Sequence, residues 1–155
     1  MRILSRFLGQ HAGADLGFSM QCLGPLVAAT ALDANGFIVP TAMRVAAIKG
    51  AWTVVGGSGA KCFVRKCTGT QAPSAGTTII SATAATGFNS DGSFDLTSAV
   101  NTVRTGLLAA TEATLRLASG DRIALDFAGT LTGLEGFLVQ VHLLPLPDVH
   151  YHIAD

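Results

Sequence analysis

Residues 115–127 constrain the fold of this chain more than any other stretch. Their sequence is LRLASGDRIALDF, and in its second half three apolar residues alternate with Arg122, Ala124 and Asp126. A period of two turns the apolar set to one face of a strand and the charged set to the other. Gly120 can take the positive φ that tight turns often need. The stretch therefore predicts two short, half-buried antiparallel strands joined as a hairpin by a polar turn.

Segments of the same character recur along the chain, separated by Gly, Asn or Pro turns. The strongest lies at residues 136–144, where four apolar side chains share one face and Gln140 and His142 share the other. Trp52, the only Trp, is expected to anchor a long strand, and the Gly-rich residues 56–59 are expected to form a hairpin loop. Strands are predicted over residues 16–23, 37–39, 42–55, 61–67, 77–83, 99–108, 107–118, 122–127 and 136–144.

Residues 107–118 allow two interpretations. Their Ala, Leu and Glu content would permit a helix. Their Thr residues, and the alternation at residues 115–117, favour a loop followed by a strand, which is the interpretation chosen.

About eight strands at this spacing, without a long helix, predict an all-β protein. The expected architecture is an antiparallel β-sandwich, jelly-roll-like, with short N- and C-terminal arms. A length of 155 residues suits one domain. We expect an N-terminal arm at residues 1–15, the sandwich at 16–147 and a C-terminal tail at 148–155.

Charge and hydropathy narrow the function. The chain has ten basic and ten acidic residues, 49% hydrophobic residues and a mean hydropathy of +0.47. A neutral protein has no strong attraction to nucleic acid, so a DNA- or RNA-binding role is disfavoured. No apolar run approaches the ~18 residues of a membrane span. Such a low-charge surface tends to associate, so we expect partner subunits to cover much of it.

The cysteines argue against a disulfide framework. There are three, Cys22, Cys62 and Cys67, and the last two point to opposite faces of one predicted strand. Arg6 and Gln10 interrupt any apolar core of a signal peptide. We therefore expect a protein made in a reducing cytoplasm.

Three stretches are candidates for ligand sites. The Gly-rich residues 56–59 lack the Gly-Lys-Ser/Thr of a phosphate loop. Acidic and polar residues alternate from Asn89 to Asp95 as in a calcium loop, but Val100 stands where a bidentate Glu is needed, so an Asx-turn loop is predicted. His150 and His152 would share a face of the tail, but two ligands make a weak metal site. We expect no metal and no cofactor.

Catalytic residues are equally scarce. No Gly-x-Ser-x-Gly elbow occurs, and His142 is better explained as an exposed or hydrogen-bonded strand residue than as a base. Asp121, Asp126 and Glu135 could converge as a glycosidase pair, but the first two have opposite strand parity. The sequence predicts that the chain is not an enzyme.

The C-terminal half resembles a known family. Residues 101–108 (NTVRTGLL), residues 115–127 and residues 139–145 (VQVHLLP) resemble the capsid decoration, or cement, proteins and related virion β-domains of tailed bacteriophages. The segment from Thr78 to Asn89 is also similar, so that the resemblance covers roughly residues 60–146.

The resemblance implies a small β-sandwich that adds to the outside of a phage capsid, often as a trimer at three-fold positions. Its partner would be the major capsid protein, whose neighbouring subunits it would cement, and its place would be the virion exterior. At the N-terminus, Ile3, Leu4, Phe7 and Leu8 have helical spacing, which suits an amphipathic helix, a partner-binding arm or a small cap on the chain's own core. The residues expected to grip the capsid are Arg2, Ile3, Arg6, Phe7, Leu8, Tyr151 and Ile153.

Two other functions are compatible with a β-domain of this kind. One is a head-fibre or tail-spike module that binds a receptor or carbohydrate, for which one Trp and one Tyr are a poor supply of aromatic side chains. The other is a hydrolase whose site the sequence does not reveal.

Overall fold

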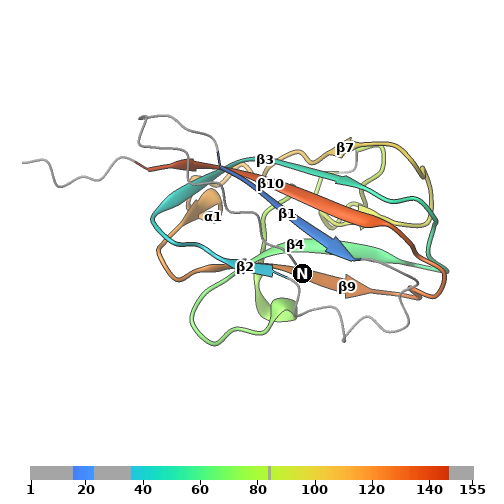
Figure 1. The fold of residues 1–155 in the computed structure, drawn as a ribbon, viewed down its shortest axis with the longest axis horizontal. Coiled ribbons are helices and arrows are strands. Elements are labelled where there is room, and N and C mark those ends of the chain that lie inside the picture. The colour runs from blue at the N-terminus through green and yellow to red at the C-terminus, as the bar shows by residue number, and fades with distance from the viewer. Residues whose placement is uncertain (1–15, 23–35, 84, 147–155) are drawn as a thin grey trace, which may run out of the picture.

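A computed structural model describes residues 16–22, 36–83 and 85–146 of the chain. Within them the strands form two five-stranded antiparallel sheets that pack face to face (Figure 1). The strands are β1 (Leu16–Cys22), β2 (Gly36–Ile38), β3 (Met43–Ala51), β4 (Lys61–Cys67), β5 (Thr77–Thr78), β6 (Phe94–Asp95), β7 (Arg104–Thr105), β8 (Arg116–Leu117), β9 (Arg122–Ala128) and β10 (Phe137–Pro145). The helices are a 3-10 turn, η1 (Pro73–Ala75), and α1 (Glu112–Leu115).

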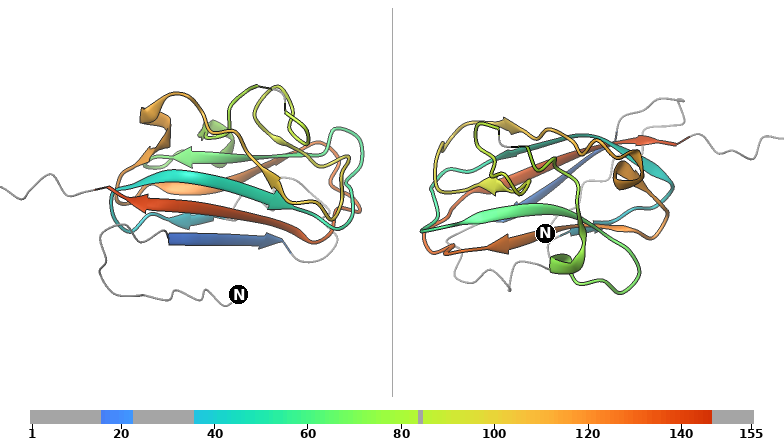
Figure 2. Two further views of the ribbon diagram at one scale, coloured as in Figure 1. Left: turned by 90° about the horizontal axis from the view of Figure 1, so that it is seen from above. Right: turned by 180° about the vertical axis from the view of Figure 1, so that it is seen from behind.

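The strand order is that of a jelly roll. The first sheet has the order β1-β10-β3-β7, with β8 also paired to β3, and the second has the order β2-β9-β4-β5, with β6 also paired to β4. The chain changes sheet at each step from β1 to β4 and again from β8 to β9 and from β9 to β10, as the views in Figure 2 show. β5 and β6 both pair with β4, and β7 and β8 both pair with β3. If each of these two pairs counts as one strand position, the sandwich has the eight positions of a jelly roll. The prediction of an antiparallel β-sandwich is confirmed.

The core lies between the two sheets and contains a cluster of aromatic rings. Trp52 is fully buried, and its indole Nε1 donates a 2.8 Å hydrogen bond to the carbonyl oxygen of Ser98. The ring centroids of Phe94 and Phe137 lie 6.3 and 6.4 Å from that of Trp52, and Phe127 packs edge-on against Phe137 at 5.4 Å. Burial of large rings in such geometries stabilises a small core strongly. The expected role of Trp52 as an anchor is confirmed.

The alternation predicted for residues 136–144 is present in β10. Phe137, Val139, Val141 and Leu143 are all buried, and the residues between them are partly exposed. β10 pairs with β1 on one side and with β3 on the other, so it lies inside the first sheet. A strand with paired neighbours on both sides and one buried face produces the clearest sequence signal.

Residues 115–127 do not form a hairpin. β8 pairs with β3 in the first sheet, but β9 pairs with β2 and β4 in the second, so the turn between them crosses from one sheet to the other. Gly120 does take a positive φ of 88°. Its N–H donates to Val39, whose own N–H donates to Asp121. The turn is therefore joined to the residue that directly follows β2.

The prediction of a hairpin loop at residues 56–59 is wrong for the same reason. β3 and β4, which flank this segment, belong to different sheets. Gly57 donates to the carbonyl oxygen of Thr130, and Thr130 donates to that of Ser58, so the segment pairs with the loop after β9. A Cβ on Gly129 would lie 2.0 Å from the carbonyl oxygen of Gly59, which explains the glycine at this crossing.

Four predicted strands are shorter than expected by more than one residue. Residues 42–55 contain β3, which covers only Met43–Ala51. Residues 99–108 contain only the two-residue β7, because Ala99 and Asn101 take positive φ values of 59° and 55° in a turn. Residues 107–118 contain α1 followed by β8, so both interpretations of that stretch hold in part. Residues 77–83 contain β5 and an isolated bridge between Ile80 and Leu108.

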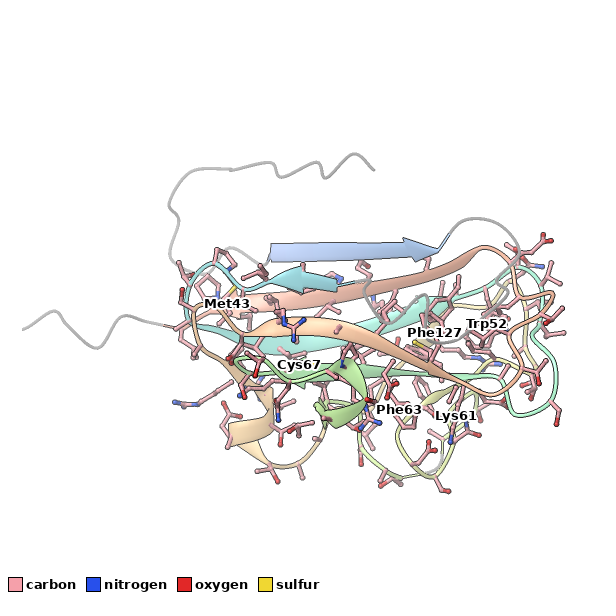
Figure 3. All side chains as sticks on the ribbon, turned by 90° about the horizontal axis from the view of Figure 1, so that it is seen from below. Met43, Trp52, Lys61, Phe63, Cys67 and Phe127 are labelled. Atoms are coloured by element: carbon pink, nitrogen blue, oxygen red, sulfur yellow. The ribbon has the colours of Figure 1, made fainter. Side chains whose placement is uncertain are left out.

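The described chain enters and leaves the sandwich at the same end. In β1 and β10, Leu16 lies opposite Leu143, and at the start of β3 Met43 lies opposite Pro145. Met43 and Trp52 lie at opposite ends of the sandwich in Figure 3. We call the end that holds Leu16, Met43 and Pro145 the arm end, since residues 1–15 and 147–155 are attached to it.

Candidate interaction surface

The side chains that the sequence predicted as capsid contacts lie outside the described residues. This holds for every member of the set, which is Arg2, Ile3, Arg6, Phe7, Leu8, Tyr151 and Ile153. His150 and His152 also lie outside them. These assignments stay predictions, and the described surface has to be judged by its own geometry.

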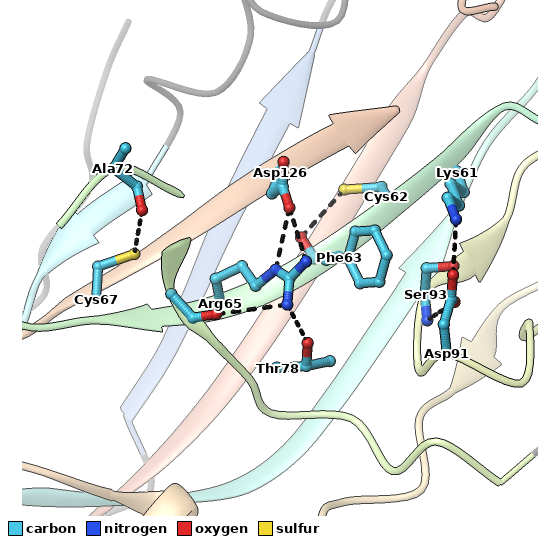
Figure 4. A network of polar contacts seen from close by, with 11 residues as sticks. Lys61, Cys62, Phe63, Arg65, Cys67, Ala72, Thr78, Asp91, Ser93 and Asp126 are labelled. Carbon is cyan, nitrogen blue, oxygen red and sulfur yellow. Dashed lines mark hydrogen bonds and ion pairs between the residues drawn. The ribbon is translucent and has the colours of Figure 1, made fainter. Parts of the chain in front are cut away.

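Charged side chains on the outer face of the second sheet form a closed network (Figure 4). Arg65 on β4 makes an ion pair with Asp126 on β9, with 3.0 Å between Nη2 and Oδ2. The Arg65 guanidinium also lies over the ring of Phe63, 4.0 Å from its centroid, and donates to the hydroxyl of Thr78 and the carbonyl oxygen of Gly76. Most donors of Arg65 are satisfied internally, so these side chains form a structural network.

The polar loop after Phe88 takes the Asx-turn form. Asp91 Oδ1 accepts hydrogen bonds from the N–H and hydroxyl of Ser93, and Asp91 Oδ2 accepts one from Lys61 Nζ at 2.7 Å. Burial alone would raise the pKa of Asp91, but the hydrogen bonds from Lys61 and Ser93 outweigh it and lower that pKa. The ammonium group of Lys61 therefore binds the carboxylate that a calcium ion would need as a ligand.

The sulfur atoms lie on opposite faces of β4, as predicted. Cys62 belongs to the core, and Cys67 lies on the outer side beneath the loop that contains Ala72. Burial raises the pKa of the Cys67 thiol, although Arg122 and Arg65 oppose the effect. Among the described residues, no three His, Cys, Asp or Glu side chains gather closely enough to hold a metal ion.

The three acids considered as a glycosidase pair serve separate purposes. Asp121 accepts the N–H of Ala118 and lies 3.7 Å from Lys66 Nζ. Asp126 pairs with Arg65, as described above. Glu135 lies in the loop between β9 and β10, opposite Val54. Two of the three carboxylates thus have a cationic partner of their own.

Exposed aliphatic side chains occur at the end of the sandwich away from the arm end and along the adjoining edge of the first sheet. Val103 is 67% exposed and Leu107 is 56% exposed. The segment that carries them is held to the end of β3, because Asn101 donates to the carbonyl oxygen of Trp52 and Gly106 to that of Ile48. We call this surface the apolar border, and it consists of Val54, Val55, Val100, Val103 and Leu107.

The apolar border continues onto the outer face of the first sheet. A shallow depression there is lined by Val103, by Leu138 of β10 and by three residues of β3, which include Lys49 and Ala51. The lining is mostly apolar, with Lys49 and Gln140 as its polar side chains. A surface of this kind can bind another protein by burying aliphatic area.

The sequence did not single out the apolar border. Val100, Val103 and Leu107 fall in the stretch predicted as a strand over residues 99–108, where an alternating pattern would have buried half of the side chains. The one available signal was the imperfect alternation itself. Apolar residues that follow no period and lie between turns are typical of an exposed edge.

Comparisons with known proteins give no match: no protein-family model, no curated protein and no solved structure is similar to this chain. No helix within the described ranges is long and apolar enough to span a membrane. The fold and the surface therefore define the class of this protein, which is an antiparallel β-sandwich of jelly-roll order with an exposed apolar border.

Proposed function

We propose that this chain is a structural virion protein that binds the outer surface of a phage capsid and cements neighbouring major capsid subunits. The observation that carries the proposal is the register of β1 with β10, in which Leu16 lies opposite Leu143. This register attaches both terminal segments to one end of a compact jelly roll. The two terminal segments can then bind the same capsid surface, and the apolar border faces away from that surface.

The fold class supports this function. Jelly rolls of two antiparallel sheets recur in viral capsid proteins, although the same architecture also occurs in lectins and cupins. The resemblance of residues 101–108 and 115–127 to phage decoration proteins agrees with the viral case. A role on the virion exterior as a homotrimer, without catalysis, is part of the proposal.

The cementing itself would be mechanical. Each buried Å² of apolar surface contributes about 25 cal/mol, so two short arms per copy give only modest affinity. An oligomer that presents several pairs of arms gains avidity, because each later contact forms at high effective concentration. Many such copies would resist expansion of the shell without a large interface at any one of them.

Binding to undecorated capsids tests the proposal. Full-length protein should bind them saturably in a fixed ratio to the major capsid protein and raise the temperature at which they burst. Variants that lack residues 1–15 or residues 148–155 should bind at least about tenfold more weakly, with unchanged unfolding of the sandwich. Failure of the full-length protein to bind, or equal binding by a variant that lacks both segments, would refute the assigned function.

A receptor- or carbohydrate-binding module of a head fibre or tail spike is the alternative. Glycan sites commonly use aromatic faces, and of the described Phe and Trp side chains all except Phe37 are buried. Phe37 is partly exposed on the edge strand β2. Binding of the protein to a glycan array, lost on Phe37→Ala, would favour the alternative over the capsid role.

A further inference from the structure

Three charged side chains stand apart from all the others in the described chain. Lys49, Arg104 and Glu135 have neither an ion pair nor a side-chain hydrogen bond with any described residue. By contrast, the other described Lys and Arg side chains, except that of Arg122, all lie in ion pairs, and Arg122 donates to the carbonyl oxygen of Gln71. Three charged side chains therefore have no compensating partner within the described ranges.

The two cations that have no partner among the described residues lie on adjacent strands but point to opposite faces of the first sheet. In the ladder between β3 and β7, Lys49 lies opposite Thr105 and Gly50 lies opposite Arg104. Lys49 lines the depression on the outer face of the first sheet. The side chain of Arg104 starts from the opposite face of the sheet and packs against Gly87. Its buried Nε has no hydrogen-bond acceptor among the described residues. One sheet edge therefore offers two positive charges, one from each face.

The unpaired carboxylate lies at the same end of the sandwich but in a different loop. Glu135 is exposed and forms a backbone bridge with Val54, whose side chain is itself 41% exposed. Val54 forms the bridge with Glu135, and Val103 lines the depression beside Lys49. The two parts of the apolar border adjoin where Asn101 donates to the carbonyl oxygen of Trp52. Opposite charges are thus placed at the two ends of one aliphatic surface, without a contact between them in the monomer.

We propose that the apolar border is a self-association interface in which Glu135 of one copy meets Lys49 of the next. The charges are complementary between copies, so a second copy of this chain is the occupant that the surface fits. The Glu135 end of the border on one copy meets the Lys49 end on the next, which makes the contact head-to-tail, and such a contact closes into a ring when the rotation between copies allows. The aliphatic side chains supply affinity and the charges set the register.

This inference deepens the proposed function, because it locates the contact by which copies of a cementing protein would join. It leaves the arm end free to contact the capsid. Binding of the capsid and association of copies would then depend on opposite ends of the sandwich and can be measured apart.

Charge reversal tests the pairing on the full-length protein. The association constant is measured by sedimentation over a range of concentrations, and thermal unfolding checks that each variant is folded. Lys49→Glu alone and Glu135→Lys alone should each weaken association about tenfold or more. The double variant K49E/E135K restores opposite charges across the contact and should recover association. A wild-type monomer at all concentrations, or a double variant no better than the singles, would overturn the proposal.

A matched pair of aliphatic positions tests the location. Val103 on the apolar border and Ile38 on β2 are almost equally exposed, at 67% and 66%, but Ile38 lies on the other sheet at its edge. Val103→Asp should abolish association, and Ile38→Asp should leave it unchanged. Equal loss in both variants would place the interface elsewhere. If association follows these expectations but capsids are not bound, the interface stands and the capsid role fails. If capsids are bound but association does not follow these expectations, the capsid role stands and the interface fails.

Discussion

Arg65 and Asp126 form an ion pair between adjacent strands of the second sheet, although they are not opposite each other in register. Phe63 is the residue opposite Asp126, and Arg65 reaches diagonally across, with 3.0 Å from both Nε and Nη2 to the same carboxylate oxygen. Only 17% and 10% of the two side chains remain exposed. The ring of Phe63 beneath the guanidinium completes a partly desolvated unit.

Removal of one member of this pair should be more damaging than replacement of both. Asp126→Ala leaves the buried charge of Arg65 uncompensated, and we expect a loss of about 3 kcal/mol in the free energy of unfolding. The double variant R65L/D126L should lose clearly less, since no charge is left without a partner. Urea denaturation measures both. A double variant as unstable as D126A would show that packing, and not charge compensation, determines the stability of this face.

Asp91 should make the stability depend on pH in the acid range. Its pKa in the folded chain lies below the ordinary aspartate value of 3.8, since hydrogen bonds from Lys61 and Ser93 outweigh the opposing effect of burial. The unfolded chain therefore binds more protons near this pH, and the stabilisation, fully present above about pH 5, is lost as the pH falls through the folded-state pKa.

The test compares urea midpoints of the wild type and Asp91→Asn between pH 6 and pH 3. The variant should show a smaller loss across the window, because the titrating group is gone. Lys61→Met should flatten the curve as well, because the carboxylate loses the hydrogen bond from Lys61. Parallel curves for all three proteins would contradict the assignment of the pH dependence to Asp91.

Gly50 and Gly17, both in strands of the first sheet, should respond differently to the same substitution. A Cβ on Gly50 would lie 2.7 Å from two ring atoms of Phe94, whereas a Cβ on Gly17 would have its nearest neighbour, Gln140 Nε2, at 3.7 Å. Gly50→Ala overpacks the aromatic core and should cost about 1–3 kcal/mol in unfolding free energy. Gly17→Ala should stay within about 0.5 kcal/mol of the wild type, as surface substitutions usually do. Comparable losses at both positions would rule out a steric cause.

Two strands, β4 and β10, could be predicted from the sequence almost to the residue. β4 has the predicted bounds Lys61–Cys67, and β10 matches the predicted residues 136–144 to within one position at each end. In both, the alternation of apolar and polar side chains records which face meets the core. The fold class followed, because several such strands separated by turn residues have few ways to pack.

The sequence could not predict whether two strands joined by a turn pair with each other or belong to different sheets. Gly120 with its positive φ satisfies a hairpin and a crossing between sheets equally well, so the local pattern leaves the choice open. The bond from Gly120 to Val39, about 80 residues earlier, decides for the crossing. A single sequence carries no record of that long-range contact.

The candidate surface depends on such contacts even more. Lys49 and Arg104 are far apart in the chain and become neighbours only through the β3–β7 ladder. Neither has a carboxylate partner among the described residues, and this is a property of the assembled sandwich. Low charge and high hydropathy did indicate that some surface would be covered, but the position of that surface follows from the fold alone.

Cys67 should react with thiol reagents before Cys62 in the folded protein. Both side chains are fully buried, but Cys62 belongs to the core between the sheets, whereas Cys67 lies beneath the loop at residues 72–76. A Cβ on Gly76 would lie 2.7 Å from the Cys67 sulfur, so this loop is its immediate cover. Local opening of a loop costs less free energy than opening of a core, so Cys67 becomes accessible more often.

Two variants with one thiol each make the comparison, C22A/C62A for Cys67 and C22A/C67A for Cys62. Labelling of Cys67 should be faster by about tenfold or more under native conditions, and the two rates should converge in denaturant, where the cover is gone. Because burial raises the pKa of Cys67 above the ordinary thiol value of 9.0, its rate should keep rising with pH past that point. Faster labelling of Cys62, or equal rates in the native protein, would mean that the loop does not open separately from the sandwich.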